Sequence, residues 1–135
     1  MATRTVAPAD QAHPVFARIW TTAMRRFQPQ SIKEKRAQLA RGLHGVVVEV
    51  GCGSGSAFPF YPAQVTQVTA IEPEPYLRAQ AQEAAKSAPV PVEVVAGTGA
   101  AIPAADDSAD AVVCSLVLCS VPDQAATLAE IARVL

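Results

Sequence analysis

Residues 46–55 are the segment that most restricts the fold of this chain, a run of Val-Val-Val-Glu-Val followed by Gly-Cys-Gly-Ser-Gly. An unbroken series of branched apolar residues is typical of a central parallel strand that is covered on both faces. The alternate glycines Gly51, Gly53 and Gly55 permit backbone conformations that other residues avoid, and they let a ligand approach the main chain. The segment therefore predicts a buried strand that ends in a ligand-binding loop.

Two carboxylates accompany this loop. Glu49 precedes the glycines, and Glu72 follows a second strand-like run, Val65 to Ile71, seventeen residues after Gly55. In nucleotide-binding folds an acid at the end of the second strand accepts hydrogen bonds from ribose hydroxyls. The spacing predicts a bound nucleoside with Glu72 as the ribose acceptor. The alternative is that Glu72 only caps a helix beginning near Pro73.

The residues after the glycines distinguish two kinds of nucleoside cofactor. A dinucleotide-binding loop has the pattern G-x-G-x-x-G and places a pyrophosphate at the start of the next helix. Here Ser56 stands at the sixth position, and Pro59 and Pro62 interrupt the helix that should follow. S-adenosyl-L-methionine (SAM) contains an adenosine and an amino acid but no phosphate, so the sequence favours SAM over NAD.

With these features the chain resembles the class I SAM-dependent methyltransferases, in the small-molecule branch that includes the ubiquinone and menaquinone biosynthesis enzymes. Residues 49–55 are similar to the first family motif and residues 71–73 to the second. Residues 97–103 resemble the adenine-side loop, and residues 110–118 resemble the fourth strand. The resemblance covers residues 46–135 and implies methyl transfer to a small, apolar acceptor. The implied product is S-adenosyl-L-homocysteine (SAH), and no metal is implied.

The resemblance also implies roles for individual residues. Glu49 would orient the cofactor ammonium or a water, or else pair with a lysine or arginine. Thr98 would face the adenine amino group, and the Gly99 backbone would donate to the ring. Ser115 and Leu116, at the end of the fourth strand, would border the sulfonium, or else serve only in strand packing. No motif identifies a general base. The cofactor-binding residues implied are Glu49, Gly51, Cys52, Gly53, Gly55, Glu72, Pro73, Thr98, Gly99, Ser115 and Leu116.

The hydrophobic pattern of the remaining chain predicts alternating strands and helices, which is typical of a doubly wound α/β fold with a mostly parallel, Rossmann-like sheet. The right-handed crossover rule places the strands in the order 3-2-1-4. The resemblance implies a sheet that lacks strands 5 to 7 of the family. The strands are predicted at 46–50, 66–71, 92–96 and 110–116, and the helices at about 74–87 and 123–135.

The first third of the chain predicts two further helices. Apolar residues from Val15 to Phe27 recur at helical spacing, and a second helix is predicted from Ser31 to Leu43. Ser31 would be its N-cap and Glu34 would complete a capping box. The predicted organisation is a flexible tail (1–13), an N-terminal helical cap (14–45) and an incomplete SAM-binding α/β domain (46–135).

The charges are unevenly distributed. Residues 1–45 contain eight of the eleven lysines and arginines, whereas the rest of the chain contains ten of the twelve acids. The basic helices could contact a lipid surface, or they could simply present a solvated face. Nucleic acid is not expected as a partner, because no aromatic residues alternate with the charges. The absence of a long apolar run or a secretion signal predicts a cytoplasmic protein.

Two further predictions concern the state of the cysteines and the edge of the sheet. Cys52, Cys114 and Cys119 show no C-x-x-C spacing, so reduced thiols and no zinc site are expected. The strand at 110–116 is apolar on both faces, which at an exposed sheet edge predicts self-association.

Two other functions stay open on the sequence. One is a Rossmann-type oxidoreductase that uses NAD(P), against which Ser56 and the interrupted helix argue. The other is a non-catalytic fragment that binds SAM. The expected outcome is an enzyme, a SAM-dependent methyltransferase.

Overall fold

The structure is a computed structural model of the chain. The predicted tail at 1–13 and much of the first predicted helix lie outside the residues it describes. The described residues between 15 and 23 have helical backbone conformation. The residues described are Val15, Phe16, Arg18, Ile19, Thr22, Ala23 and 28–135.

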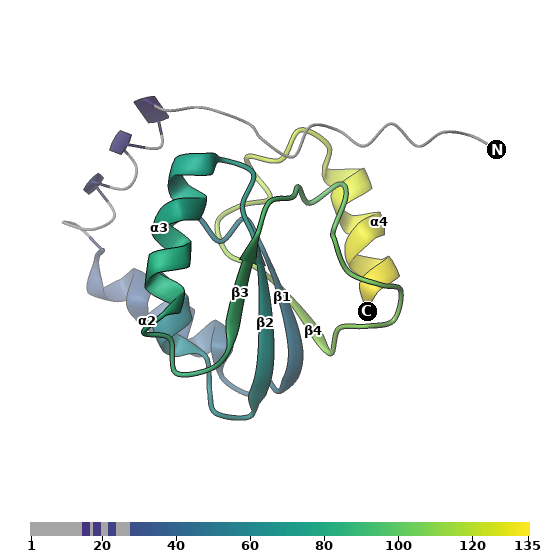
Figure 1. The fold of residues 1–135 in the computed structure, drawn as a ribbon, viewed down its shortest axis with the longest axis horizontal. Coiled ribbons are helices and arrows are strands. Elements are labelled where there is room, and N and C mark those ends of the chain that lie inside the picture. Colours follow the sequence, from purple (N-terminus) through teal and green to yellow (C-terminus); the bar gives the residue numbers. More distant parts are fainter. Residues whose placement is uncertain (1–14, 17, 20–21, 24–27) are drawn as a thin grey trace.

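Four parallel strands form the centre of the molecule in the order β3-β2-β1-β4, as predicted (Figure 1). Their register places the carboxyl end of each strand at the same level: Val50 pairs with both Ile71 and Cys114, and Ile71 pairs with Val95. The loops that follow the strands therefore meet at one edge of the sheet. The strands are β1 (Gly45–Val50), β2 (Val65–Ile71), β3 (Val92–Val95) and β4 (Ala111–Cys114).

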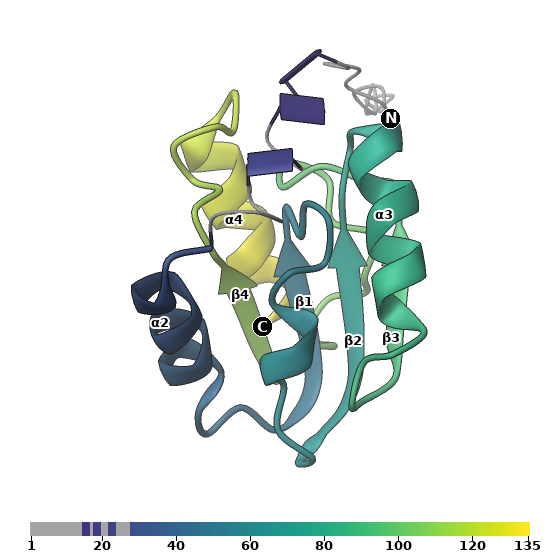
Figure 2. The same ribbon diagram turned by 90° about the vertical axis from the view of Figure 1, so that its left-hand side faces the viewer.

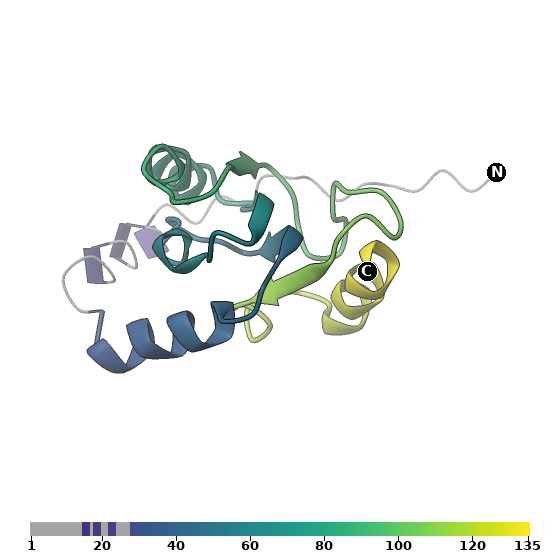
Figure 3. The ribbon, with the colours of Figure 1, turned by 90° about the horizontal axis from the view of Figure 1, so that it is seen from below.

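Helices cover both faces of the sheet. Figures 2 and 3 show α2 and α3 on one face and α4 on the other. The predicted interruption after the glycines is confirmed, because the chain there forms only a short 3-10 turn, η1 (Phe58–Phe60), which contains Pro59. The helices are α2 (Gln30–Ala40), α3 (Pro75–Ala85) and α4 (Gln124–Val134).

The alternation of β1 side chains separates two apolar cores. Val47 packs into the core under α2 and α3, together with buried Phe58. Val48 and Val50 pack into the core under α4, with Ile71. Each of these side chains is at most 2% exposed, and each such burial contributes about 1.5–3 kcal/mol relative to an exposed side chain. Glu49 lies between them in sequence and therefore points to the α2 side.

The start of α2 differs from the prediction. The N-cap is Pro29, which makes no side-chain cap hydrogen bond, so the predicted Ser31–Glu34 capping box is wrong. Pro29 already has an extended backbone, with ψ 142°, and its carbonyl accepts from the Ile32 amide at 2.9 Å. The helix consequently begins before Ser31. It ends at Ala40, shortly before Gly42 takes φ +84°.

The fourth strand is shorter than predicted. β4 ends at Cys114 instead of residue 116, because Leu116 has φ +57°, which lies outside the β region. The connection at 96–110 contains no helix.

A polar contact fixes the bottom of the sheet. Asp110, just before β4, accepts a hydrogen bond from the Val46 amide through Oδ2 at 2.7 Å, and its own amide donates to the Val46 carbonyl at 2.8 Å. The carboxylate of Asp110 fills the space where a side chain at Gly45 would begin.

Candidate functional site

The three glycines after β1 all have positive φ, but their surroundings differ. A Cβ at Gly51 would collide with Val117, and one at Gly55 would lie 2.6 Å from the Phe58 ring. A Cβ at Gly53, where φ is +58°, would meet nothing within 4 Å. Gly51 and Gly55 thus permit tight packing of the loop, and only Gly53 presents its main chain to open space.

The Glu72 side chain connects the glycine loop to the end of β2. Its carboxylate accepts from the Gly53 amide at 2.8 Å and from the Glu74 amide at 3.0 Å, and the residue is 6% exposed. Burial raises the pKa of Glu72, and the two backbone hydrogen bonds oppose that shift. A carboxylate oxygen can accept more than one hydrogen bond, so both oxygens keep capacity for hydroxyl donors.

Glu72 is not the cap of the following helix. The N-cap of α3 is Glu74, whose carboxylate accepts from the Leu77 amide at 2.7 Å. Pro73 belongs to the turn between them, which Arg78 fixes by donating to the carbonyls of Glu72 at 2.9 Å and Pro73 at 3.1 Å.

Glu49 lies below the glycine loop in a buried polar cluster. It is 2% exposed and accepts a hydrogen bond from the Tyr61 hydroxyl at 2.7 Å. Burial raises the pKa of Glu49 to about 7, although Tyr61 and the positive charge of Arg36 both lower it. The Nε and Nη1 atoms of Arg36 are buried without a hydrogen-bond partner among the described residues. Neither Tyr61 nor Arg36 was predicted as a site residue.

The loop after β3 places a further polar atom at the same edge of the sheet. Thr98 Oγ1 is buried and has no hydrogen-bond partner in the described part of the chain. The Ala101 amide donates to the Thr98 carbonyl at 3.1 Å, which folds the loop into a tight turn. Gly99 is buried between Thr127 of α4 and Val50, where a Cβ would lie 2.7 Å from the Thr127 methyl group.

The two residues predicted at the end of β4 lie in different surroundings. Leu116 is 61% exposed, and Ser115 lines a small cavity beside Arg36 under α2. Val117 is the residue of this segment that packs against Gly51. Sequence reasoning missed Val117, because the positive φ of Leu116 turns the chain and shifts which side chain faces the loop.

Cys52, inside the glycine loop, is a packed side chain and not a reactive one. It is 5% exposed, and burial raises the pKa of its thiol well above the ordinary value, with the nearby Glu49 and Glu72 adding to the shift. A thiol needs to ionise to act as a nucleophile. Cys52 thus contributes shape to the site.

A larger cavity opens behind the glycine loop. It has a volume of about 660 Å³ and lies between the start of α2, the loop and α3. Many of its lining side chains are polar, which does not match the apolar character of the acceptor that the resemblance implies. The lining residues include Lys33, Ser54, Gly55, Ser56 and Lys86.

The described residues contain no group of three or more His, Cys, Asp or Glu side chains arranged to hold a metal ion. Among the helices that the structure describes, none combines the length and apolar character needed to cross a bilayer.

Comparisons with known proteins agree with this geometry. A family model described as a methyltransferase domain matches residues 48–135. The human thiol S-methyltransferase TMT1A is 42% identical over 92 residues, which is 66% of this chain and 37% of that protein. Human thiol S-methyltransferase TMT1B is 34% identical over 130 residues, 90% of this chain and 52% of that protein. The chain thus spans between about a third and a half of the length of these curated relatives.

Solved structures show the same fold at lower identity. A Methanococcus maripaludis protein has a TM-score of 0.74 at 17% identity, over 100% of this chain and 63% of that one. A SAM-dependent methyltransferase from Aquifex aeolicus has a TM-score of 0.66 at 20% identity, over 92% of this chain and 68% of that one. The [4+2]-cyclase SpnF also matches, with a TM-score of 0.67 at 22% identity over 78% of this chain and 40% of that one.

Proposed function

Because the chain belongs to the class I SAM-dependent methyltransferase family, we propose that its glycine loop and Glu72 bind SAM and that it transfers a methyl group to a small thiol. The single observation that carries the binding proposal is the open main chain at Gly53, joined to the buried Glu72 carboxylate at 2.8 Å. The thiol acceptor comes from the names of the curated relatives.

The residues present fit a nucleoside with an amino-acid end. Glu72 would accept from the ribose hydroxyls. Thr98 Oγ1 is a buried polar atom without a partner in the described chain, so it is suited to accept from the adenine amino group. Glu49 would face the ammonium, and Gly53 the amino-acid backbone. The remaining candidates, Gly51, Cys52, Gly55, Pro73, Gly99, Ser115 and Leu116, would shape the site around these four.

The chemistry requires little of the protein beyond positioning. When bound, SAM supplies a methyl group on a positively charged sulfur, which is a good leaving group as a neutral thioether. The chain would hold the reacting atoms in line and exclude water. We assign no general base: the attacking species would be the thiolate, formed by loss of the thiol proton to solvent before the transfer, as occurs for a cysteine thiol with its ordinary pKa of about 8.5.

The family assignment argues against an oxidoreductase that uses NAD(P). The short η1 turn also provides no long helix whose start could bind a pyrophosphate. A SAM-binding protein without methyltransferase activity remains the second candidate. The fold alone does not decide between the two candidates, since the [4+2]-cyclase SpnF has the same fold.

The proposed contact with a lipid surface rests on exposed side chains near the N-terminus. Val15, Phe16 and Ile19 are between 59% and 71% exposed, and Arg18 lies over the Tyr76 ring with its guanidinium carbon 5.9 Å from the centroid. Apolar and basic side chains together support peripheral contact with a lipid surface. The helical cap would also cover the cofactor and shape the acceptor site.

The binding proposal is tested by calorimetry with SAH on the wild-type protein and on Gly53→Val. Valine at φ +58° brings a branched side chain into the open space of the loop, so binding should be lost. The matched control is Gly42→Val: Gly42 has φ +84° and open space, yet lies at the end of α2. Both variants carry similar backbone strain, of about 1–2 kcal/mol.

The result is read from the difference between the two variants. Loss of SAH binding in Gly53→Val with retention in Gly42→Val supports the site. Equal affinity in Gly53→Val and wild type would contradict it. Transfer of a tritiated methyl group to small alkyl thiols, with the matching alcohols as controls, then separates the methyltransferase from the non-catalytic binding protein.

A further inference from the structure

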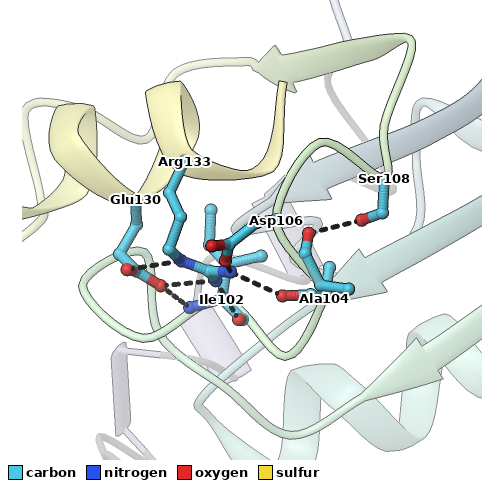
Figure 4. Close-up of polar contacts among 7 residues, drawn as sticks. Ile102, Ala104, Asp106, Ser108, Glu130 and Arg133 are labelled. Carbon is cyan, nitrogen blue, oxygen red and sulfur yellow. Dashed lines mark hydrogen bonds and ion pairs between the residues drawn. The ribbon is translucent and has the colours of Figure 1, made fainter.

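The connection between β3 and β4 is fastened to α4 by an Arg133–Glu130 pair (Figure 4). Arg133 Nε donates to Glu130 Oε1 and Arg133 Nη2 donates to Glu130 Oε2, both at 2.9 Å. This is a two-pronged contact between a planar guanidinium and a carboxylate, a strong and directional arrangement. Glu130 is 5% exposed, and the Arg133 side chain is 25% exposed.

The pair holds Ile102 at both of its backbone groups. The Ile102 amide donates to Glu130 Oε2 at 2.9 Å, and its carbonyl accepts from Arg133 Nη2 at 2.9 Å. Ile102 is itself 4% exposed in the core under α4. One residue of the loop is therefore fixed in position and orientation by two side chains of one helix.

The remaining Arg133 donors secure the rest of the connection. Nη1 donates to the Ala104 carbonyl at 2.8 Å and to Asp106 Oδ1 at 2.7 Å. In return, the amides of Asp107 and Ser108 donate to the carbonyls of Arg133 and Val134 at 3.0 and 2.8 Å. A long connection without a helix is thereby ordered by the end of α4.

This contact lies directly beside the residues proposed to meet the adenine. Ile102 follows the Thr98–Ala101 turn, and Gly99 within that turn is packed against Thr127, two helical turns before Arg133 on α4. The helix therefore fixes the turn from both ends: Thr127 limits how far Gly99 can move, and the Glu130–Arg133 pair fixes the residue that follows.

We propose that Arg133, acting through Glu130 and Ile102, is a positioning residue for recognition of the adenine base. It would hold the turn so that Thr98 Oγ1 and the Gly99 amide face the edge of the base. This inference rests on the proposed function, since it requires a nucleoside at the site. Arg133 itself would not touch the ligand.

Arginine is needed for this role because of its geometry. Its five N–H donors are fixed in one plane and serve two carboxylates and two carbonyls at once, whereas a lysine has three donors on a single nitrogen. Arg133→Lys keeps the charge but should hold Ile102 less well. Arg133→Met removes the contact altogether, and Glu130→Gln weakens the two-pronged pairing.

The experiment compares two ligands by calorimetry on the 135-residue protein. SAH carries adenine, and S-inosyl-L-homocysteine carries a carbonyl oxygen in place of the amino group. The wild type should prefer SAH, since a site that pairs with a substrate N–H discriminates strongly against a ligand lacking it. In Arg133→Met the SAH affinity should fall about tenfold, the value of one lost hydrogen bond, and the preference should largely disappear. Arg133→Lys and Glu130→Gln should be intermediate.

The ratio of the two affinities separates positioning from general stability. Asp106→Asn is the control, because the Asp106 side chain is 73% exposed and such pairs contribute little; its ratio should equal the wild-type ratio. A ratio unchanged in Arg133→Lys and Glu130→Gln overturns the inference, even if Arg133→Met fails to fold. If the wild type binds neither ligand, the proposed function itself is wrong and the inference falls with it.

Discussion

At the scale of the residue, Glu49 should make the free energy of unfolding depend on pH. Its pKa is raised to about 7 from an ordinary value of 4.5 because the carboxylate is buried. Between these values the folded protein binds more protons than the unfolded chain, so stability falls as the pH rises from 4.5 through 7. This one group should lower the free energy of unfolding by about 3 kcal/mol over that range.

Urea unfolding of Glu49→Gln measures this contribution. The variant should show a free energy of unfolding that depends less on pH, and the difference between wild type and variant should follow the titration of Glu49. Glu93→Gln, at an exposed position of β3, is the control and should keep the wild-type pH dependence. Parallel curves for wild type and Glu49→Gln between pH 4.5 and 8 would contradict the expected effect.

The sequence predicted that Gly53 and Glu72 lie close together, as the structure shows, but it did not predict the contacts made by more distant segments. Gly53 and Glu72 follow strands directly, and the register of a parallel sheet brings strand ends together. Tyr61 and Arg36 reach Glu49 only through the packing of η1 and α2, which no spacing in the sequence encodes. The contact between Val117 and Gly51 was not predicted either, because it depends on a single positive φ at Leu116 that a leucine seldom adopts.

At the scale of the element, α3 should depend on the capping carboxylate of Glu74. This side chain is 7% exposed and accepts from the Leu77 amide at 2.7 Å. Glu74→Ala leaves a buried amide unsatisfied and should lower the free energy of unfolding by about 1–2 kcal/mol. The measurement is urea denaturation monitored by circular dichroism.

Glu83→Ala on the same helix is the matched control. Glu83 pairs with Lys86 at 2.6 Å, but both side chains are more than 70% exposed. Its removal should change stability by no more than about 0.5 kcal/mol. If both variants were equally stable, the Glu74 side chain would not be acting as a cap.

The element boundaries show what periodicity can and cannot predict. The existence of all four strands follows from their apolar runs and their order from the crossover rule, and α3 and α4 begin within a residue or two of the expected positions. The start of α2 was misplaced because either Pro29 or Ser31 could serve as the N-cap, and the sequence did not show which one does. By contrast, the pair Glu74-Pro75 is an acid followed by proline, a pattern typical of a helix start, and it marks the start of α3.

At the scale of the whole molecule, the exposed strand β4 should cause self-association. In the described structure β4 pairs only with β1, and its other edge carries no strand. Unpaired backbone groups on an apolar edge strand are a template for pairing with another chain. The elution volume in size-exclusion chromatography should therefore decrease as the protein concentration rises into the high micromolar range.

The comparison is made with the same protein at low concentration, in reducing buffer to exclude disulfides through exposed Cys119. A monomeric elution volume at every concentration would show that β4 does not recruit a second chain.

The contact between Gly45 and Asp110 joins two positions that lie far apart in the sequence. Because the Asp110 carboxylate occupies the volume of any side chain at position 45, the two sites are not independent in mutational libraries. Randomising position 45 alone should yield few folded clones. A smaller residue at position 110 would make space for a side chain at 45, but it would remove the hydrogen bond to the Val46 amide and leave the backbone strain at φ +68°. Directed evolution of this domain should treat the two codons as one.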